Sequence, residues 1–297
     1  MHNGVIILNK GENISSQTAV LKVKRLFGAS KAGHTGTLDP LATGVLPILI
    51  GRAVKASEYV TSEDKHYSAT LLLGIETDTE DITGEIVSSC DRIPSEDEVR
   101  QAVKKMIGEI TQTPPMYSAI KVGGKKLYEL AREGKVIERP SRNVIIFSIE
   151  VSRINEKEYK LDVHCSKGTY IRTLCADIGK LLGVGGVMKT LTRTECAGFT
   201  LDDAYTIEEL EKMSEEERVS LIHPTEKLFE EYERIDFSPF FSRLARCGVE
   251  IYLKKINISA ECGKRFSLYD NGVFFALGEV REFDTGLAIK PIKQFDI

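Results

Sequence analysis

The chain has 297 residues, of which 42% are hydrophobic, and its formal net charge is -4. This length allows one large hydrophobic core and a small second domain, so we expect two domains. The residues after Met1 lack the basic start, apolar core and cleavage site of a signal peptide, and no apolar run is long enough to span a membrane.

The six cysteines are scattered, without a C-x-x-C pair or a histidine at zinc-ligand spacing. We therefore expect reduced thiols in a cytoplasmic protein, and we expect no metal and no other cofactor. The neighbours His164 and Cys165 have the residue types of a catalytic nucleophile and its base. A buried cysteine at the end of an apolar strand is the simpler interpretation.

The first third of the chain alternates strand and helix patterns. The apolar segment 4–9 predicts a buried strand. Ser15 or Ser16 is expected to cap a helix, because apolar residues follow at helical spacing as far as Phe27. A short apolar run at 45–50 predicts an interior strand, in which Pro47 indicates a strand start or a bulge.

The middle of the chain predicts two more strand patterns and two helices. Residues 65–74 form a strand pattern, and a helix is expected over 95–107. Alternating residues at 144–154 and 159–165 predict an antiparallel pair of strands, because only a short polar turn separates them. A further helix is expected over 169–182.

Residues 113–140 predict a protruding insertion, because prolines and glycines surround one short helical piece at 125–132. Between Arg100 and Arg142, ten Lys or Arg residues stand against four Glu residues. A solvated surface is the simplest interpretation of such a charge run. A basic face that contacts phosphates is the alternative, and the overall negative charge does not exclude it.

A Glu-rich helical stretch between Asp202 and Asp236 reverses this charge balance. The remainder predicts a small β domain, because short alternating runs are separated by Gly, Asn and Asp. Those runs are 249–256, 265–269, 273–280 and 286–292. We expect a larger domain over residues 1–235 and a small domain over 236–297.

The segment 33–44, GHTGTLDPLATG, is a loop that holds one carboxylate, Asp39, in front of Pro40. Asp-Pro commonly starts a turn, and the glycine motifs that bind nucleotide phosphates are absent. A long loop of glycines, threonines and a histidine between apolar elements also suits an active site. The residue types alone leave both interpretations open.

This loop resembles the signature of the TruB family of tRNA pseudouridine synthases, in which the aspartate is the catalytic residue. Three further segments match the family in the expected order, namely the opening strand at 4–10, the tyrosine motif at 65–67 and the arginine motif at 167–173. Residues 115–128 also match, so the resemblance covers about residues 4–200. The family usually has proline where this chain has Gly11, which puts the local rigidity there in doubt.

The resemblance implies an α+β fold, in which helices flank a mixed, largely antiparallel sheet and a PUA-like β domain follows. It implies isomerisation of uridine to pseudouridine in the T-loop of tRNA, at position 55. The base is flipped out, its bond from N1 to ribose C1′ is broken, and C1′ is bonded to C5. The carboxylate can attack C1′ or C6, or remove the 2′ proton to give a glycal, and the sequence leaves these routes open.

The family's catalytic roles transfer to three residues of this chain. Asp39 is the essential carboxylate, and Arg172 would hold it charged and oriented. Tyr67 would stack on the flipped base, and its hydroxyl could carry a proton. Without the resemblance, Arg172 would be assigned to a helix surface and Tyr67 to strand packing.

The resemblance also implies RNA-binding or substrate-binding residues around them. His34 would fill the space that the flipped base leaves. Tyr170 would line the pocket or pack in the core, and Leu191 is assigned to the same pocket. Lys10 would support the pocket or meet a phosphate.

The insertion resembles a mobile thumb, in which Lys121, Lys125 and Lys126 would lie near the RNA backbone. The implied partner is the T-arm stem-loop of tRNA, and we expect a monomer that needs no protein partner. A guide-RNA-dependent subunit of the same fold is one alternative, and the direct start into the catalytic domain disfavours it. A tRNA-binding chaperone without catalysis is another, and the intact catalytic residues disfavour it.

Overall fold

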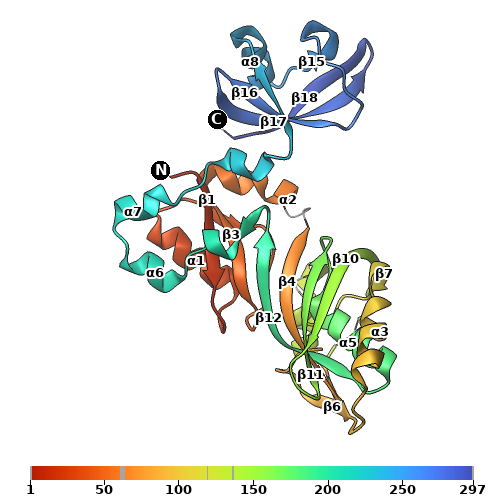
Figure 1. Cartoon of the computed structure of the whole chain (residues 1–297). Coiled ribbons are helices and arrows are strands. Elements are labelled where there is room, and N and C mark those ends of the chain that lie inside the picture. The colour runs from red at the N-terminus through yellow and green to blue at the C-terminus, as the bar shows by residue number, and fades with distance from the viewer. Residues whose placement is uncertain (1, 61–63, 119, 136, 296–297) are drawn as a thin grey trace.

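The computed structural model describes residues 2–60, 64–118, 120–135 and 137–295. For residues 121, 122, 125, 126, 128 and 132 it describes the backbone alone. A nine-stranded sheet with helices forms the larger part of the molecule, and a five-stranded sheet near the C-terminus forms the smaller part (Figure 1). The predicted α+β class is confirmed.

The large sheet runs in the order β1-β3-β12-β4-β11-β10-β7, and all pairs but one are antiparallel. These strands are β1 (Gly4–Lys10), β3 (Thr43–Ile50), β12 (Gly186–Cys196), β4 (Lys65–Leu73), β11 (Glu158–Cys165), β10 (Arg142–Arg153) and β7 (Gly108–Gln112). β2 (Ala32–His34) pairs with β3, and β13 (Phe199–Thr200) pairs with β12. The short hairpin of β5 (Ile75–Thr77) and β6 (Ile86–Ser89) stands apart from this sheet.

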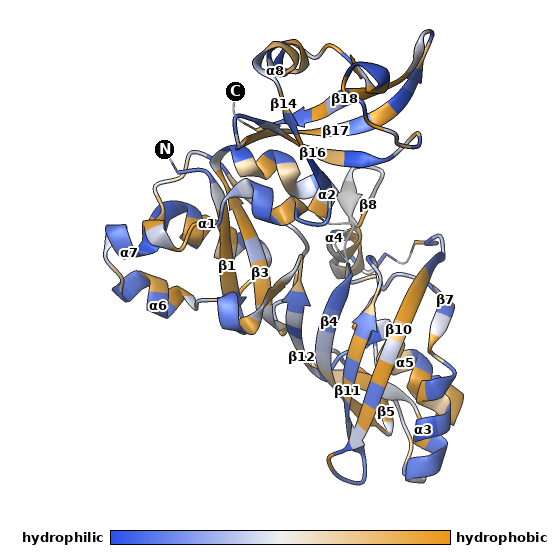
Figure 2. Ribbon diagram, turned by 45° about the horizontal axis from the view of Figure 1, so that its top comes forward, coloured by the Kyte–Doolittle hydropathy of each residue, from blue (hydrophilic) through white to orange (hydrophobic). Residues whose placement is uncertain are grey.

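Strands β1 and β3 are buried on both faces, which explains their continuous apolar sequences (Figure 2). Two hydrophobic cores lie on the two faces of this sheet, and we call the larger one the main core. Ile6 and Leu8 face the main core, whereas Val5 and Ile7 face the second core on the other side. β4 instead alternates buried and half-buried residues, because only one of its faces is covered.

Helices cover the main-core face of the sheet. They are α1 (Ser16–Leu26), α3 (Glu96–Lys104) and α5 (Ile171–Leu182). Ser15 caps α1, as one of the two predicted positions, and Ser95 forms a capping box with Glu98 at the start of α3. α5 ends at Gly183, which has the left-handed conformation common after a helix. The opposite face carries η1 (Gly51–Ala56) and α2 (Ser57–Val60).

The sequence did not predict β12, although it lies in the middle of the sheet. Its pairing with β4 shifts register between Met188 and Thr190 and again between Arg193 and Glu195. Each bulge interrupts the alternation of inward and outward side chains, so the pattern of a strand is lost.

The interpretation of Pro47 as a strand start or bulge was wrong. Pro47 lies inside β3 and pairs with Ile7 of β1 without a register shift. On the other side of β3, β2 ends at His34 and β12 pairs only with Thr43 and Gly44. The missing N–H of Pro47 therefore falls between two partner strands, where the ladder needs no donor.

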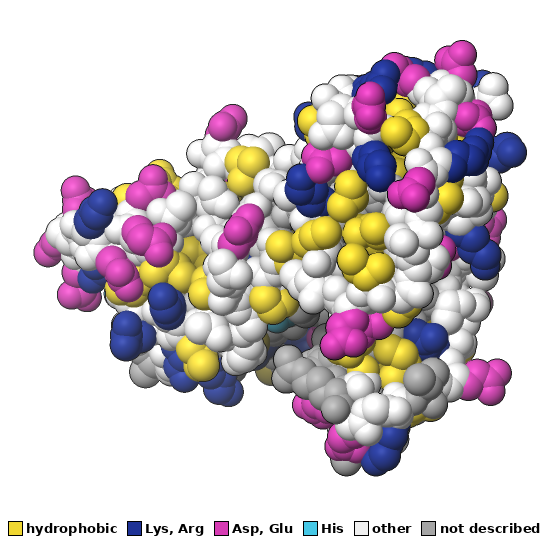
Figure 3. Space-filling view, turned by 90° about the horizontal axis from the view of Figure 1, so that it is seen from below, with side chains coloured by type: hydrophobic (Ala, Val, Ile, Leu, Met, Phe, Trp, Pro, Cys, Tyr) yellow, Lys and Arg dark blue, Asp and Glu magenta, His cyan; other side chains and the backbone are white. Residues whose placement is uncertain are grey.

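An acidic arm projects beside β1. It contains η2 (Leu201–Asp203), α6 (Ile207–Lys212), α7 (Glu215–Ser220) and η3 (Thr225–Phe229). Acidic side chains gather over α6 and α7 (Figure 3). In each of these two helices a threonine or serine caps the N-terminus and pairs with a glutamate three residues later. Two glutamates of this stretch, Glu209 and Glu217, therefore stabilise helix ends.

The second sheet has the order β14-β16-β17-β18-β15. Its strands are β14 (Glu233–Phe237), β15 (Ile251–Tyr252), β16 (Arg265–Asp270), β17 (Val273–Phe283) and β18 (Gly286–Gln294). α8 (Pro239–Arg246) was not predicted, and the strand expected over 249–256 is only β15 followed by η4 (Leu253–Lys255).

The second sheet has its own core, and Leu277 and Phe295 extend it into the core beneath β1 and β3. β14 crosses the predicted boundary at residue 235 and pairs in parallel with β16. We propose that the second domain begins at Glu233.

The predicted insertion contains a hairpin of two short strands, each two residues long, and a short helix. The strands are β8 (Lys121–Val122) and β9 (Lys125–Lys126), and the helix is α4 (Leu127–Arg132). The expected helical piece is thus present over most of its predicted length. The side chains of Lys121, Lys125 and Lys126 lie outside the described residues, so their predicted role stays a prediction.

Candidate active site

The loop that carries Asp39 connects β2 to β3 and is fixed by the start of α1. The Ser16 hydroxyl donates to the Leu38 carbonyl and accepts from the Leu38 amide, both at 2.8 Å. Leu38 is 3% exposed and packs in the main core. Because Leu38 is held at its amide, carbonyl and side chain, the position of the next residue, Asp39, is also fixed.

Lys10 supports the other side of the loop. Its side chain is fully buried, and its Nζ donates to the carbonyl oxygens of Gly11 (2.8 Å), Ile14 (3.0 Å) and Pro40 (3.4 Å). Burial lowers the pKa of Lys10 to about 8, although the Asp39 carboxylate opposes this change. An ammonium enclosed in this way supports the loop and does not reach solvent, where an RNA phosphate would lie.

Asp39 and Arg172 form the central ion pair. Arg172 Nε lies 3.0 Å from Asp39 Oδ2; the arginine side chain is 5% exposed and the aspartate side chain 37%. Burial raises the pKa of Asp39, and Asp81 raises it further, whereas Arg172 and Lys10 lower it. The structure thus brings the predicted carboxylate and arginine together, with the carboxylate at an accessible edge.

The rest of the Arg172 guanidinium is held by groups that the sequence did not single out. Nη1 donates to the Thr79 carbonyl at 3.1 Å and lies 3.6 Å from Asp81 Oδ2, and Nη2 donates to the Tyr117 carbonyl at 2.8 Å. Arg172 therefore links the loop that carries Asp39 to the segments after β5 and β7. These contacts leave the guanidinium little freedom to turn away from Asp39.

Asp81 is a second carboxylate at this site, and it is itself restrained. Its Oδ1 accepts from the Thr79 hydroxyl at 2.9 Å and from the Thr83 amide and hydroxyl at 2.9 and 2.6 Å. Asp81 is 6% exposed, compared with the accessible Asp39. Its place between two threonines in the sequence was the available signal, since short hydroxyl residues commonly satisfy a buried carboxylate.

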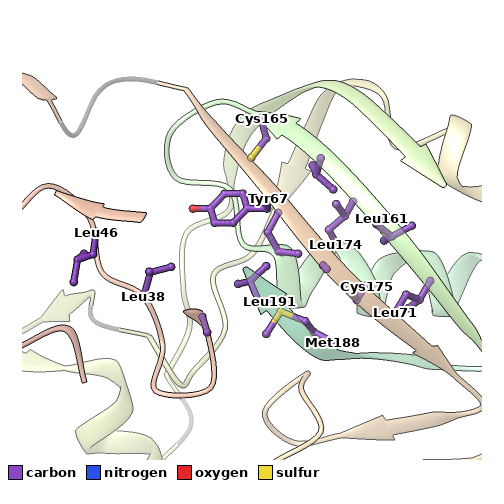
Figure 4. Close-up of a cluster of buried hydrophobic side chains, with 14 of the residues drawn as sticks. Leu38, Leu46, Tyr67, Leu71, Leu161, Cys165, Leu174, Cys175, Met188 and Leu191 are labelled. Atoms are coloured by element: carbon purple, nitrogen blue, oxygen red, sulfur yellow. The ribbon is translucent and has the colours of Figure 1, made fainter. Parts of the chain in front are cut away.

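Tyr67 lies on the buried face of β4 and is 9% exposed. Figure 4 shows its hydroxyl pointing from β4 towards the loop that holds Leu38, with Leu191 beside the ring. Burial raises the pKa of Tyr67 to about 12, so the phenol is neutral at physiological pH. An aromatic ring and a leucine thus lie beside the loop that carries Asp39. The predicted roles of Tyr67 and Leu191 stay predictions.

Arg193 is a further residue of the site that the sequence did not indicate. It lies on β12, is 1% exposed, and donates to the carbonyls of Val45 (2.7 Å) and Gly36 (3.1 Å). On the neighbouring strand β4, Tyr67 lies directly opposite Arg193, and the guanidinium lowers the pKa of the Tyr67 phenol against the effect of burial. In the sequence, a single arginine between threonines has the pattern of an exposed strand residue. The sequence therefore did not indicate that Arg193 is buried at the site.

His34 ends β2 at the edge of the site. Its Nδ1 accepts a hydrogen bond from the Gly36 amide at 3.2 Å, so Nε2 carries the proton in the neutral ring. Burial lowers the pKa of His34, and the Arg193 guanidinium lowers it further. The residue therefore offers a neutral, half-buried ring.

Tyr170 precedes α5, two residues before Arg172. Its backbone is paired with the Gln112 side-chain amide at 3.0 and 3.2 Å, and the Arg142 guanidinium lies 4.7 Å above its ring. The described contacts of the ring thus place it beside Arg142. Its predicted place in the pocket stays a prediction.

Cys165 and His164 are not a nucleophile pair. Cys165 is fully buried, its thiol contacts the Lys65 carbonyl, and burial raises its pKa to about 11. His164 points to the other face of the sheet, where its ring stacks on His66. The interpretation of Cys165 as a buried strand residue is confirmed.

Within the described ranges, no group of three or more His, Cys, Asp or Glu residues could hold a metal ion. None of the helices in these ranges is long and apolar enough to cross a membrane. The site contains the accessible carboxylate of Asp39, the buried carboxylate of Asp81, a buried lysine, two arginines, a buried phenol and a neutral imidazole. Such groups can hold an anion or a polarised bond and move protons.

The chain resembles known proteins over nearly its whole length. Residues 24–171 match the model of the TruB family pseudouridylate synthase (N terminal domain), and residues 172–230 match the tRNA pseudouridylate synthase B C-terminal domain. The tRNA pseudouridine synthase B of Alkaliphilus oremlandii (strain OhILAs) is 45% identical over 284 residues, covering 95% of this chain and 94% of that protein. That of Francisella tularensis subsp. novicida (strain U112) is 42% identical, covering 99% and 95%.

A solved structure has the same fold. A chain of a Cbf5-Nop10-Gar1 complex superposes with a TM-score of 0.72 at 25% identity, covering 98% of this chain and 84% of that one. The family motifs, the pairing of Asp39 with Arg172 and the relatives along almost the full length agree. On these grounds, the chain belongs to the TruB family of pseudouridine synthases.

Proposed function

We propose that this protein isomerises uridine to pseudouridine in tRNA, at position 55 of the T-loop, and that it acts alone. The observation that carries the proposal is the accessible Asp39 carboxylate, which the buried Arg172 holds on the loop towards which the Tyr67 hydroxyl points. The relatives at 42% and 45% identity, which carry the name tRNA pseudouridine synthase B, support tRNA as the substrate.

The reaction rearranges bonds without net oxidation or hydrolysis. The bond from N1 to C1′ breaks, C1′ bonds to C5, and the proton that C5 loses is balanced by the proton that N1 gains. Asp39 acts on the ribose or the base, either as a nucleophile or as a base for the 2′ proton. Both roles require the ionised carboxylate, which Arg172 and Lys10 favour against the effect of burial.

The base must leave the stacked loop before this chemistry begins. We assign the ring of Tyr67 and the side chain of Leu191 to the surfaces on which the flipped uracil rests, since both lie beside the catalytic loop. The Tyr67 hydroxyl is our candidate to carry the proton from C5. It can accept this proton only as the phenolate, and because burial raises its pKa to about 12, another group must stabilise that ionised form.

We assign to His34 the space that the flipped base leaves in the RNA. Its neutral ring is half-buried and can stack on a neighbouring base without placing a charge there. The insertion at 113–140 and the second domain would contact the RNA backbone. We regard the second domain as PUA-like.

We further propose that the protein acts in the cytoplasm as a monomer. All six cysteines are free, which suits a reducing compartment. The solved complex with Nop10 and Gar1 belongs to a protein that is only 25% identical. The two relatives are much closer in sequence, so we favour an enzyme that needs no guide RNA.

The proposal is tested with the purified protein and a T-arm stem-loop whose uridines carry tritium at C5. We expect release of one tritium per hairpin from the target uridine, because C5 loses its hydrogen in the reaction. A hairpin with cytidine at the target position is the control and should release none. A wild-type protein that released tritium only with a guide RNA and partner proteins would refute the stand-alone assignment.

A further inference from the structure

Arg193 is a cation in the interior of the catalytic domain. It is 1% exposed, and none of the ion pairs between described residues includes it. A buried guanidinium is costly unless its donors are satisfied. The groups that satisfy it therefore indicate what Arg193 does in the fold.

Those groups belong to two different parts of the site. Gly36 lies near the start of the Asp39 loop and Val45 lies just after its end, and Arg193 donates to the carbonyl of each. Arg193 also lies opposite Tyr67 in the register of β12 and β4. One side chain thus closes the base of the loop from the strand position that neighbours the phenol.

The backbone of Arg193 makes a second close contact with the loop. Gly44 has a φ of +103°, and a Cβ at this position would lie 2.2 Å from the Arg193 carbonyl oxygen. In the sheet, Arg193 is opposite both Gly44 on β3 and Tyr67 on β4. Arg193 therefore sets the spacing between the strand that carries Tyr67 and the loop that carries Asp39.

Arg193 also determines the charge environment of the phenol. The titratable groups that face Tyr67 are Arg193, Cys165 and Cys196. The two thiols raise the pKa of Tyr67 in addition to burial, whereas the arginine lowers it. Around the arginine itself lie Lys10 and His34, whose pKa values it lowers.

We propose that Arg193 is a positioning residue of the isomerisation, one that aligns the Tyr67 hydroxyl with the Asp39 loop and stabilises the phenolate. This inference rests on the proposed function. Arg193 acts through Tyr67 and the loop, and it does not itself contact RNA.

The test uses the full chain with 3,5-difluorotyrosine at position 67, which lowers the phenol pKa and gives a fluorine NMR signal. In Arg193→Gln, which keeps hydrogen-bond donors but removes the charge, we expect the titration midpoint of this signal to rise by about one pH unit or more. In Arg193→Lys, which keeps the charge, we expect the midpoint to stay within about half a pH unit of the original.

Kinetics on the T-arm hairpin provide the second measurement. Both variants should lower kcat by about a hundredfold, because neither can bridge Gly36 and Val45 as the guanidinium does. KM should change by less than about threefold, since Arg193 makes no RNA contact. Arg218→Lys is the matched control: it also removes an arginine that donates to two backbone carbonyls, those of Leu210 and Met213, and it should change neither quantity.

The proposal is overturned if the fluorine midpoint is the same with Arg193 and with Gln at this position. It is equally overturned if kcat falls only in proportion to the folded fraction. If Arg193→Gln does not fold, the kcat of Arg193→Lys decides alone. An Arg193→Lys variant with the kcat of the wild type would contradict the positioning role. If the wild type converts no hairpin, the proposed function fails, whereas the titration still tests the contact.

Discussion

Arg172 donates from Nε to Asp39 at 3.0 Å and from Nη1 and Nη2 to the carbonyls of Thr79 and Tyr117. One buried side chain thus joins the loop that carries Asp39, the segment after β5 and the segment after β7. The ion pair is therefore part of the fold as well as of the site. Substitutions at either residue should therefore change both activity and stability, although not in the same direction.

Arg172→Lys should impair both activity and stability. A lysine has one ammonium group and cannot reach the carboxylate and both carbonyls at once. We expect kcat on the T-arm hairpin to fall by about a hundredfold and the free energy of unfolding to fall by about 1–3 kcal/mol. Arg281→Lys is the control, because Arg281 is 52% exposed and pairs with Glu279 at 3.0 Å. Equal losses in both variants, measured by urea unfolding, would contradict this expectation.

Asp39→Asn should stabilise the protein at neutral pH. Burial raises the pKa of Asp39, so the folded protein holds the proton more tightly than the unfolded chain does. Such a group destabilises the fold once the pH exceeds both pKa values, and this effect vanishes below the unfolded pKa. We expect a higher Tm than wild type at pH 7 and equal Tm values near about pH 3. A lower Tm for the variant at pH 7 would show that Arg172 outweighs burial.

Lys10→Met should change how stability depends on alkaline pH. The folded pKa of Lys10 is about 8, against an ordinary value of 10.5, so between these values only the unfolded chain holds the proton. The free energy of unfolding of the wild type should therefore rise relative to the variant from pH 8 to pH 10.5, by roughly 3 kcal/mol in total. Below pH 8 the difference should be constant. If the free energies of unfolding of wild type and variant differed by the same amount at every pH, Lys10 would have its ordinary pKa.

Gly44→Ala should be strongly destabilising. The new Cβ would lie 2.2 Å from the Arg193 carbonyl oxygen at a φ of +103°. We expect the free energy of unfolding to fall by about 3 kcal/mol or more. Gly28→Ala is matched in having a positive φ, of +56°, but no atom lies within 4 Å of its added Cβ. That control should lose only about 1–2 kcal/mol, and a similar loss at both positions would exclude the steric explanation.

Local sequence patterns predicted those elements whose burial is regular. β1 and β3 are buried on both faces and were visible as apolar runs, and α1 and α3 were visible from their serine caps and helical spacing. β12 was missed because two bulges break its alternation. α8 was missed because it lies among strand-like runs, and its segment was assigned to the β domain together with them.

Only those site residues that lie in a family motif could be predicted from the sequence. Asp39 and Arg172 came from the family resemblance, and the structure places them in contact. Arg193 and Asp81 could not be found in this way, because their importance depends on which strands and loops meet in space. Lys10 was named, but the choice between a phosphate contact and a support for the loop needed its burial.

The most direct test of the account is a single-turnover measurement of tritium released from C5 of a T-arm hairpin, with wild-type protein and with Asp39→Asn. The variant keeps the shape of the side chain and removes the charge that either route requires. We expect its rate to be lower by about a thousandfold or more, while its Kd for the hairpin stays within about threefold of wild type. A variant that released tritium at the wild-type rate would show that Asp39 is not the essential carboxylate.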